Sequence, residues 1–84
     1  MTIDYARMQR RHGPLKGSLT RATKKGPLAV IDAVEAAYDE FDEIGCWPDD
    51  WHRWARALDD AVWTARREDI ELPEHRVTNL VRRG

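Results

Sequence analysis

The segment Ile44-Gly45-Cys46-Trp47-Pro48 separates two long stretches in which apolar residues recur at helical spacing. Glycine commonly ends a helix because it adopts a left-handed backbone conformation at no steric cost. Proline suits the first turn of the following helix, where its missing N–H would have no partner. Asp49 and Asp50 come next, and carboxylates are favoured near the positive end of a helix dipole. We therefore expect one helix to end at Gly45 and another to begin at Pro48.

Both stretches carry one apolar face when their residues are placed at about 100° per residue. The first begins at Pro27, and its apolar arc consists of Val30, Val34, Ala37, Tyr38, Phe41 and Ile44. The second runs to about Arg67, and its stripe consists of Trp47, Trp51, Trp54, Leu58, Ala61 and Ala65. Two helices joined by so short a turn lie side by side and antiparallel. The sequence thus predicts an all-α fold built on a two-helix hairpin, residues 27–44 and 48–67, with the tryptophan row in its core.

A hairpin leaves each helix with an uncovered side, so flanking segments are needed to complete the core. We expect short helices near each terminus, over residues 2–11 and 74–82. Residues 12–18, which contain Gly13, Pro14 and Gly17, are typical of a loop, and residues 19–25 add one helical turn. Residues 1–84 are expected to form a single small domain, with a basic N-terminal segment, residues 1–26, that is partly mobile.

Composition favours a soluble, non-membrane protein of a reducing compartment. The chain is 42% hydrophobic and has four Trp, which is enough for a core in 84 residues. Cys46 is the single cysteine, so no internal disulfide forms. The N-terminus lacks the apolar run of a signal peptide, and no segment reaches the ~20 apolar residues of a membrane helix. These features predict a cytoplasmic location.

Charge is strongly segregated along the chain, although the net charge is only -1. Residues 1–26 contain seven Lys and Arg against one acidic residue, Asp4. Residues 27–50 contain eight Asp and Glu and no basic residue. Such asymmetry indicates either pairing within the molecule or charged partners.

An acidic stripe lies on the first hairpin helix, opposite its apolar arc. It consists of Asp32, Glu35, Asp39, Asp42 and Glu43. Three interpretations stay open: a solvated face, a face neutralised by the basic N-terminal segment, or a functional acidic surface that docks a basic partner or itself imitates nucleic-acid charge.

The basic N-terminal segment has its own alternatives. Its candidate nucleic-acid-binding residues are Arg7, Arg10, Arg11, Lys24 and Lys25. They are interpreted as partners of the acidic stripe, as phosphate-binding groups or as a solvated tail. A helix-turn-helix is not expected, since Asp49 and Asp50 would repel phosphates at the start of the second helix.

Trp63 breaks the pattern of its helix, because it projects with Arg56 and Arg67 and away from the tryptophan row. Arg56, Trp63 and Arg67 are called the Trp63 face below. Trp63 is expected either to anchor a terminal segment internally or to contact a partner, since Trp and Arg are enriched in binding hot spots.

No residue pattern supports catalysis, a cofactor or a metal site. His12, His52 and His75 are scattered and form no nucleophile–base arrangement. The acids near the turn lack the shaped loop that calcium needs, and zinc would need Cys or His ligands in a closed set. We expect a protein that is not an enzyme.

Residues 40–54 and the following Ala57-Leu58-Asp59-Asp60-Ala61 resemble short uncharacterised proteins of actinobacteria and their phages. The resemblance covers the middle third of the chain and implies a phage or mobile-element accessory protein. Eleven Arg against three Lys agrees with a GC-rich coding sequence. The leading hypothesis is a helical protein that binds another, host protein through the acidic stripe or the Trp63 face, with homodimerisation as one form of it. The alternative is a nucleic-acid-binding accessory protein.

Overall fold

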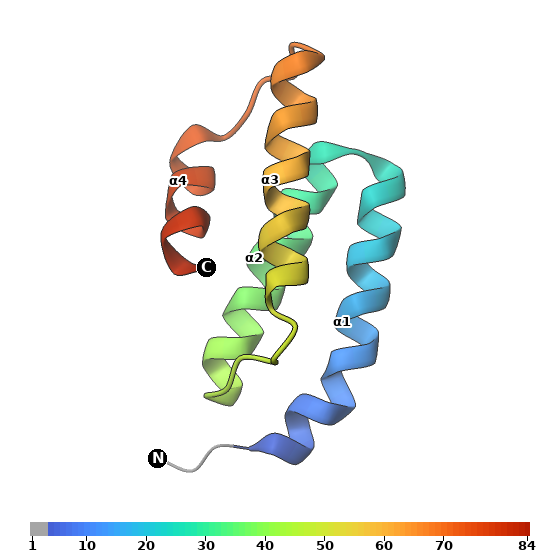
Figure 1. Ribbon diagram of the computed structural model, residues 1–84, viewed down its shortest axis with the longest axis vertical. Coiled ribbons are helices and arrows are strands. Elements are labelled where there is room, and N and C mark those ends of the chain that lie inside the picture. Colours follow the sequence, from blue (N-terminus) through green and yellow to red (C-terminus); the bar gives the residue numbers. More distant parts are fainter. Residues whose placement is uncertain (1–3) are drawn as a thin grey trace.

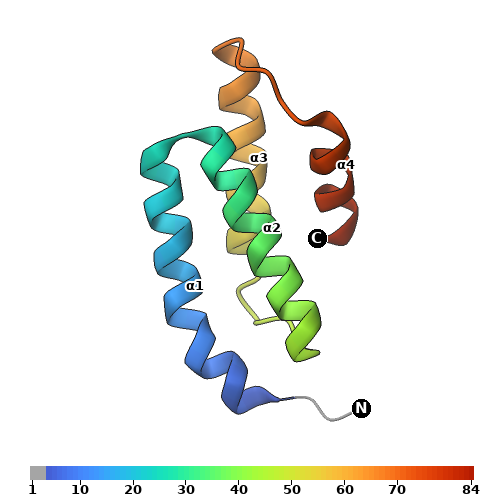
Figure 2. The same cartoon turned by 180° about the vertical axis from the view of Figure 1, so that it is seen from behind.

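The computed structural model describes residues 4–84 and confirms the all-α class, with no strand among those residues. The helices are α1 (Tyr5–Lys25), α2 (Pro27–Ile44), α3 (His52–Arg67) and α4 (Glu74–Arg83). Helix α2 is the centre of the molecule, and each of the other three packs against it. Figures 1 and 2 show α1 and α4 on opposite sides of α2, while α3 lies along a third side.

Helix α2 begins and ends where the sequence predicts. Pro27 occupies its first turn, and Gly45 follows it in the left-handed conformation, with φ of 86°. The backbone N–H of Gly45 donates to the Phe41 carbonyl at 3.0 Å, which satisfies one of the free carbonyls at the helix end. All six residues of the predicted apolar arc are buried.

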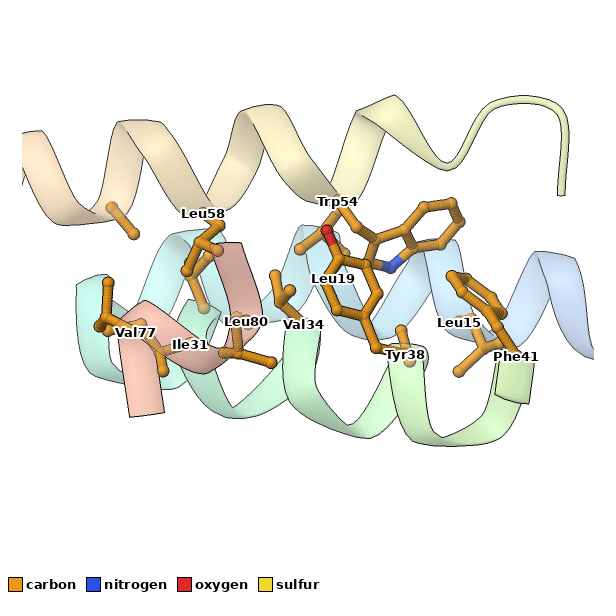
Figure 3. Packing of buried hydrophobic residues seen from close by; sticks show 14 of the residues in the cluster. Leu15, Leu19, Ile31, Val34, Tyr38, Phe41, Trp54, Leu58, Val77 and Leu80 are labelled. Atoms are coloured by element: carbon orange, nitrogen blue, oxygen red, sulfur yellow. The ribbon is translucent and has the colours of Figure 1, made fainter. Parts of the chain in front are cut away.

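The largest buried side chains come from α2 and α3, and Figure 3 shows Tyr38 and Phe41 facing Trp54. The Phe41 and Trp54 rings meet edge to face with centroids 5.1 Å apart, and Trp47 lies 4.6 Å from the Tyr38 ring. Trp54 is fully buried, whereas Trp47 and Trp51 are half-buried at the end of the core. The interpretation of the tryptophan row as core is thus confirmed for Trp54, and the other two cover its edge.

Helix α3 begins at His52, so the prediction of a start at Pro48 is wrong. Pro48 instead opens a turn, in which the Trp51 N–H donates to the Pro48 carbonyl at 3.0 Å. Asp50 precedes the helix, and its carboxylate accepts a hydrogen bond from Arg53 and is bonded to His12 of α1. The observed boundary thus lies four residues after the one that local capping preferences favour, at a turn that makes a tertiary contact.

Helix α1 is one continuous helix of 21 residues. The predicted end of a short helix at residue 11, the loop at 12–18 and the separate turn at 19–25 are therefore wrong, while residues 2 and 3 of that predicted helix lie outside the described residues. Met8, Leu15, Leu19 and Ala22 are buried against α2 and keep one apolar face through the Gly13-Pro14 segment. Pro14 removes one helical hydrogen bond and crowds the preceding turn. Figures 1 and 2 show the N-terminal part of α1 angled away from the rest, which is the usual effect of an internal proline. Tertiary packing outweighs the local cost.

Candidate interaction surfaces

Trp63 lies on the outer side of α3 and is 62% exposed, so the interpretation as an internal anchor is wrong. The guanidinium carbon of Arg67 lies 4.6 Å from the centre of the indole ring. Such a stack holds the cation over the negative face of the ring and restricts both side chains. The indole is therefore presented to solvent in an ordered position.

Arg56 and Arg67, the other residues of the Trp63 face, are exposed and make no ion pair within residues 4–84. Arg56 also lines a groove of about 420 Å³ between α1 and α3. Leu19 and Thr23 of α1 and Ala57 of α3 form other parts of its wall. The Trp63 face thus combines a large apolar group, two free cations and an adjoining groove.

The acidic stripe is paired within the molecule, mainly by α4. Arg76 bridges Asp32 at 2.8 Å and Glu35 at 2.9 Å, and Arg83 bridges Asp39 and Asp42 at 2.8 Å each. Arg76 and Arg83 were not among the predicted site residues. Their separation of seven residues places both on the same side of α4, next to the face of buried Val77 and Leu80. This spacing is the sequence signal from which they could have been predicted.

The turn end of the stripe is paired by α1. Arg7 lies 3.2 Å from Glu43, and Arg11 lies 2.9 Å from Glu40. Neutralisation by the basic N-terminal segment, one of the three alternatives, therefore applies to this end, while the rest depends on the C-terminal helix. Every member of the acidic stripe has a cationic partner, which leaves little free negative charge for a basic ligand.

These pairs alter the pKa of the groups that make them. Partial burial raises the pKa of Asp42, but hydrogen bonds from Trp47 and Arg83 and the Arg83 charge outweigh it, so the pKa is lowered. Partial burial also opposes the charged form of Arg83, yet its bonds to Asp42 and Asp39 raise the pKa. The pair of Asp42 and Arg83 thus favours the charged form of both partners.

A second polar link joins α1 to the turn before α3. His12 Nε2 lies 2.6 Å from Asp50 Oδ1, and Arg53 donates to the other carboxylate oxygen at 3.2 Å. Partial burial raises the pKa of Asp50, but the bonds from His12 and Arg53 outweigh it and lower the pKa overall. This link joins the turn before α3 to α1.

Pairing divides the predicted nucleic-acid-binding residues into two groups. Arg7 and Arg11 turn toward α2, whereas Arg10, Lys24 and Lys25 stay exposed on α1. Lys16 and Arg21, which were not in the predicted set, have no ion pair within the described chain either. Both belong to the basic N-terminal segment, but with a loop predicted at residues 12–18 the helical spacing that brings Arg21 to the side of Arg10 could not be used.

Within residues 4–84, no three His, Cys, Asp or Glu side chains are grouped so that they could hold a metal ion. No helix in the same part of the chain is long and apolar enough to cross a membrane. Comparison with family models, with curated proteins and with solved structures finds no match to this chain. Fold and surfaces together define the class only as a small all-α protein with an exposed aromatic–arginine face.

Proposed function

We propose that this chain is a non-enzymatic interaction protein that docks onto another protein through the Trp63 face. The observation that carries the proposal is the exposure of Trp63 beside two arginines that lack carboxylate partners among the described residues. Tryptophan and arginine are the residue types most enriched among interface hot spots, because both bury a large area in one well-defined geometry. A small protein that exposes a stacked indole in this way gains nothing in its own stability from the exposed ring surface.

The chemistry of the face limits the partner. The indole requires an apolar pocket, and Arg56 and Arg67 require carboxylates placed on either side of that pocket. The groove beside Arg56 offers room for a side chain of the partner. We therefore infer a partner surface with an apolar depression rimmed by Asp or Glu.

The acidic stripe has a lesser part in this proposal. A basic partner could reach Asp32 or Asp39 only by displacing the arginines of α4, which already meet them at 2.8 Å. We propose that the stripe instead holds α4 on α2, and that the antiparallel hairpin of α2 and α3 acts as the rigid support of the Trp63 face. Homodimerisation through this face is one form that docking could take.

The resemblance of residues 40–54 supports an accessory role encoded by a phage or mobile element and exercised in the host cytoplasm. The partner would then be a host protein. The absence of any catalytic constellation in the sequence agrees with a protein that acts by binding.

The test is a comparison of proteins captured from a nuclease-treated actinobacterial lysate by the wild-type chain and by Trp63→Ala. We expect the variant to lose at least about tenfold in capture, since a hot-spot truncation costs ≥2 kcal/mol. Thr78→Ala on exposed α4 is the matched control and should capture as the wild type does. Equal capture by all three chains, or no specific capture by the wild type, would refute the proposal.

A further inference from the structure

The outer side of α1 carries an uncompensated positive charge. Helix α1 contains no acidic residue from Tyr5 to Lys25. Once Arg7 and Arg11 are paired with α2, the cations of α1 that make no ion pair within the described chain are Arg10, Lys16, Arg21, Lys24 and Lys25, called the α1 cations below. Unlike the acidic stripe, which α4 covers, these cations have no described helix with acidic side chains packed over them, so their charge faces solvent.

Three of the α1 cations share one narrow face. At about 100° per residue, Arg10, Arg21 and Lys24 fall within about 60° of one another, opposite the buried face of Met8 and Leu15. Along the axis, Arg10 and Lys25 are separated by about 22 Å, from a rise of 1.5 Å per residue. Arg10, Arg21 and Lys24 therefore form an elongated patch that bends with the helix at Pro14 (Figure 1).

The middle of this patch has an exposed backbone. Gly13 and Gly17 lie on the same face, and a Cβ atom added to Gly13 would meet nothing within 4 Å. The Arg21 side chain folds back along the helix, so that its Nη1 atom lies 3.3 Å from the Cβ position of Gly17. A ligand could thus approach the helix closely between Arg10 and Arg21, where the guanidinium group of Arg21 lies beside Gly17.

We propose that this face of α1 binds the phosphate backbone of double-stranded nucleic acid without reading its sequence. A patch about 22 Å long matches roughly six base pairs at 3.4 Å each. Phosphate contacts of this kind need only positive charge, whereas base reading needs side chains in a groove. The binding is separate from the Trp63 face, which belongs to α3.

Other polyanions fit the patch less well. Single strands are bound mainly by stacking of bases on aromatic rings, and between Arg10 and Lys25 α1 has no aromatic residue apart from His12, which is engaged with Asp50. Membrane attachment needs apolar side chains between the cations, and Gly13 and Gly17 stand there instead.

The test measures fluorescence anisotropy of a labelled 24-base-pair duplex of mixed sequence, titrated with the full chain between 50 and 300 mM NaCl. We expect the logarithm of the association constant to fall linearly with that of the salt concentration, with a slope of about −3 to −4 for three or four phosphates. Arg10→Gln/Arg21→Gln should reduce the slope by about two and weaken binding about tenfold or more at 50 mM NaCl. Arg56→Gln/Arg67→Gln removes the same charge from α3 and should change affinity less than about twofold.

A second variant, Gly13→Glu, places a carboxylate on the same face near the centre of the patch and should weaken binding similarly, with circular dichroism as the check that α1 stays helical in spite of the new Cβ before Pro14. Parallel titrations use vesicles with phosphatidylserine and poly-glutamate. The proposal is overturned if the wild type does not bind the duplex at 50 mM NaCl, if the two double variants lose affinity equally, or if vesicles or poly-glutamate bind more tightly. The α1 double variant tests duplex binding, and the control pair removes the arginines of the Trp63 face. A failure of the nucleic-acid proposal can therefore be told apart from a failure of the protein-docking proposal.

Discussion

Two tryptophans on α3 occupy opposite environments. Trp54 is fully buried between α2 and α3, while Trp63 is 62% exposed. They are nine residues apart, which at about 100° per residue places them on opposite sides of the helix. The same residue type therefore contributes to the core in one place and to a contact surface in the other.

Truncation should separate these two roles. We expect Trp54→Ala to lower the free energy of unfolding by about 3–5 kcal/mol, because it leaves a cavity in the core. Trp63→Ala should lower it by no more than about 1 kcal/mol, the value of its exposed stack with Arg67. Urea denaturation followed by circular dichroism measures both, and similar losses for the two variants would show that Trp63 is structural.

Helical spacing alone predicted on which side of α3 Trp63 lies. Spacing placed it away from the tryptophan row, but it does not show whether a terminal segment covers it. That question depends on the path of residues 68–84, which carries α4 to α2 and leaves α3 open on that side. Long-range packing of this kind has no local sequence signal.

At the scale of the element, α1 and α2 are separated by a single residue, Gly26. Its φ of 128° is a conformation that residues with a Cβ rarely adopt. Gly13 lies within α1 and has no such positive φ, and no atom beyond its chain neighbours and its own helix backbone lies within 4 Å of a Cβ added to either glycine. The two positions therefore differ in backbone conformation, and Gly13 differs further in that it precedes Pro14.

Alanine should cost more at Gly26 than at Gly13. At Gly13 the gain of about 0.5–1 kcal/mol from helix propensity is offset by contact between the new Cβ and the Pro14 ring, so the free energy of unfolding should change by less than about 1 kcal/mol. Gly26→Ala should lower it by about 1–2 kcal/mol through backbone strain. Urea unfolding measures both, and an equal or smaller loss at Gly26 would contradict this account of the turn.

The boundaries of α2 were predicted correctly, whereas the extent of α1 and the start of α3 were not. Pro27 and Gly45 are strong local signals, and nothing in the tertiary structure opposes them. Equally strong local signals are present at Gly13-Pro14 and at Pro48-Asp49-Asp50. At the first, helix α1 continues and buries Leu15. At the second, Asp50 lies in a turn and is bonded to His12. Local preference determines an element only where packing agrees with it.

For the whole molecule, opposite charges that are separate in the sequence come together in the fold. Helix α2 has no basic residue, and its acids are reached by arginines from both ends of the chain. The sequence indicated pairing within the molecule as one alternative, but α4 as the main source of cations was missed. The outcome is a molecule whose acidic stripe is satisfied and whose free cations among the described residues lie mainly on α1 and α3, with Arg82 on α4.

Acid should weaken this arrangement. The pKa values of Asp42 and Asp50 are lowered in the folded chain, so both bind protons less readily there than in the unfolded chain. Their stabilisation is therefore present above the unfolded pKa of about 3.9 and is lost as the pH falls through the folded values. We expect Asp42→Asn and Asp50→Asn to lower the melting temperature at pH 7 and to differ less from the wild type at pH 3. A difference that is the same at both pH values would contradict this.

The central claim is that the Trp63 face touches another protein, and photocrosslinking beside Trp63 tests it most directly. The chain is prepared with p-benzoylphenylalanine in place of Asp59, which is exposed one helical turn before Trp63, and, as a control, at position 81, where Val81 is 55% exposed on α4. Both chains keep the indole and are irradiated in a nuclease-treated actinobacterial lysate, then examined by denaturing gel electrophoresis and mass spectrometry. We predict a discrete adduct with one protein from position 59 and none from position 81. The same adducts from both positions, or no adduct from position 59, would contradict the claim.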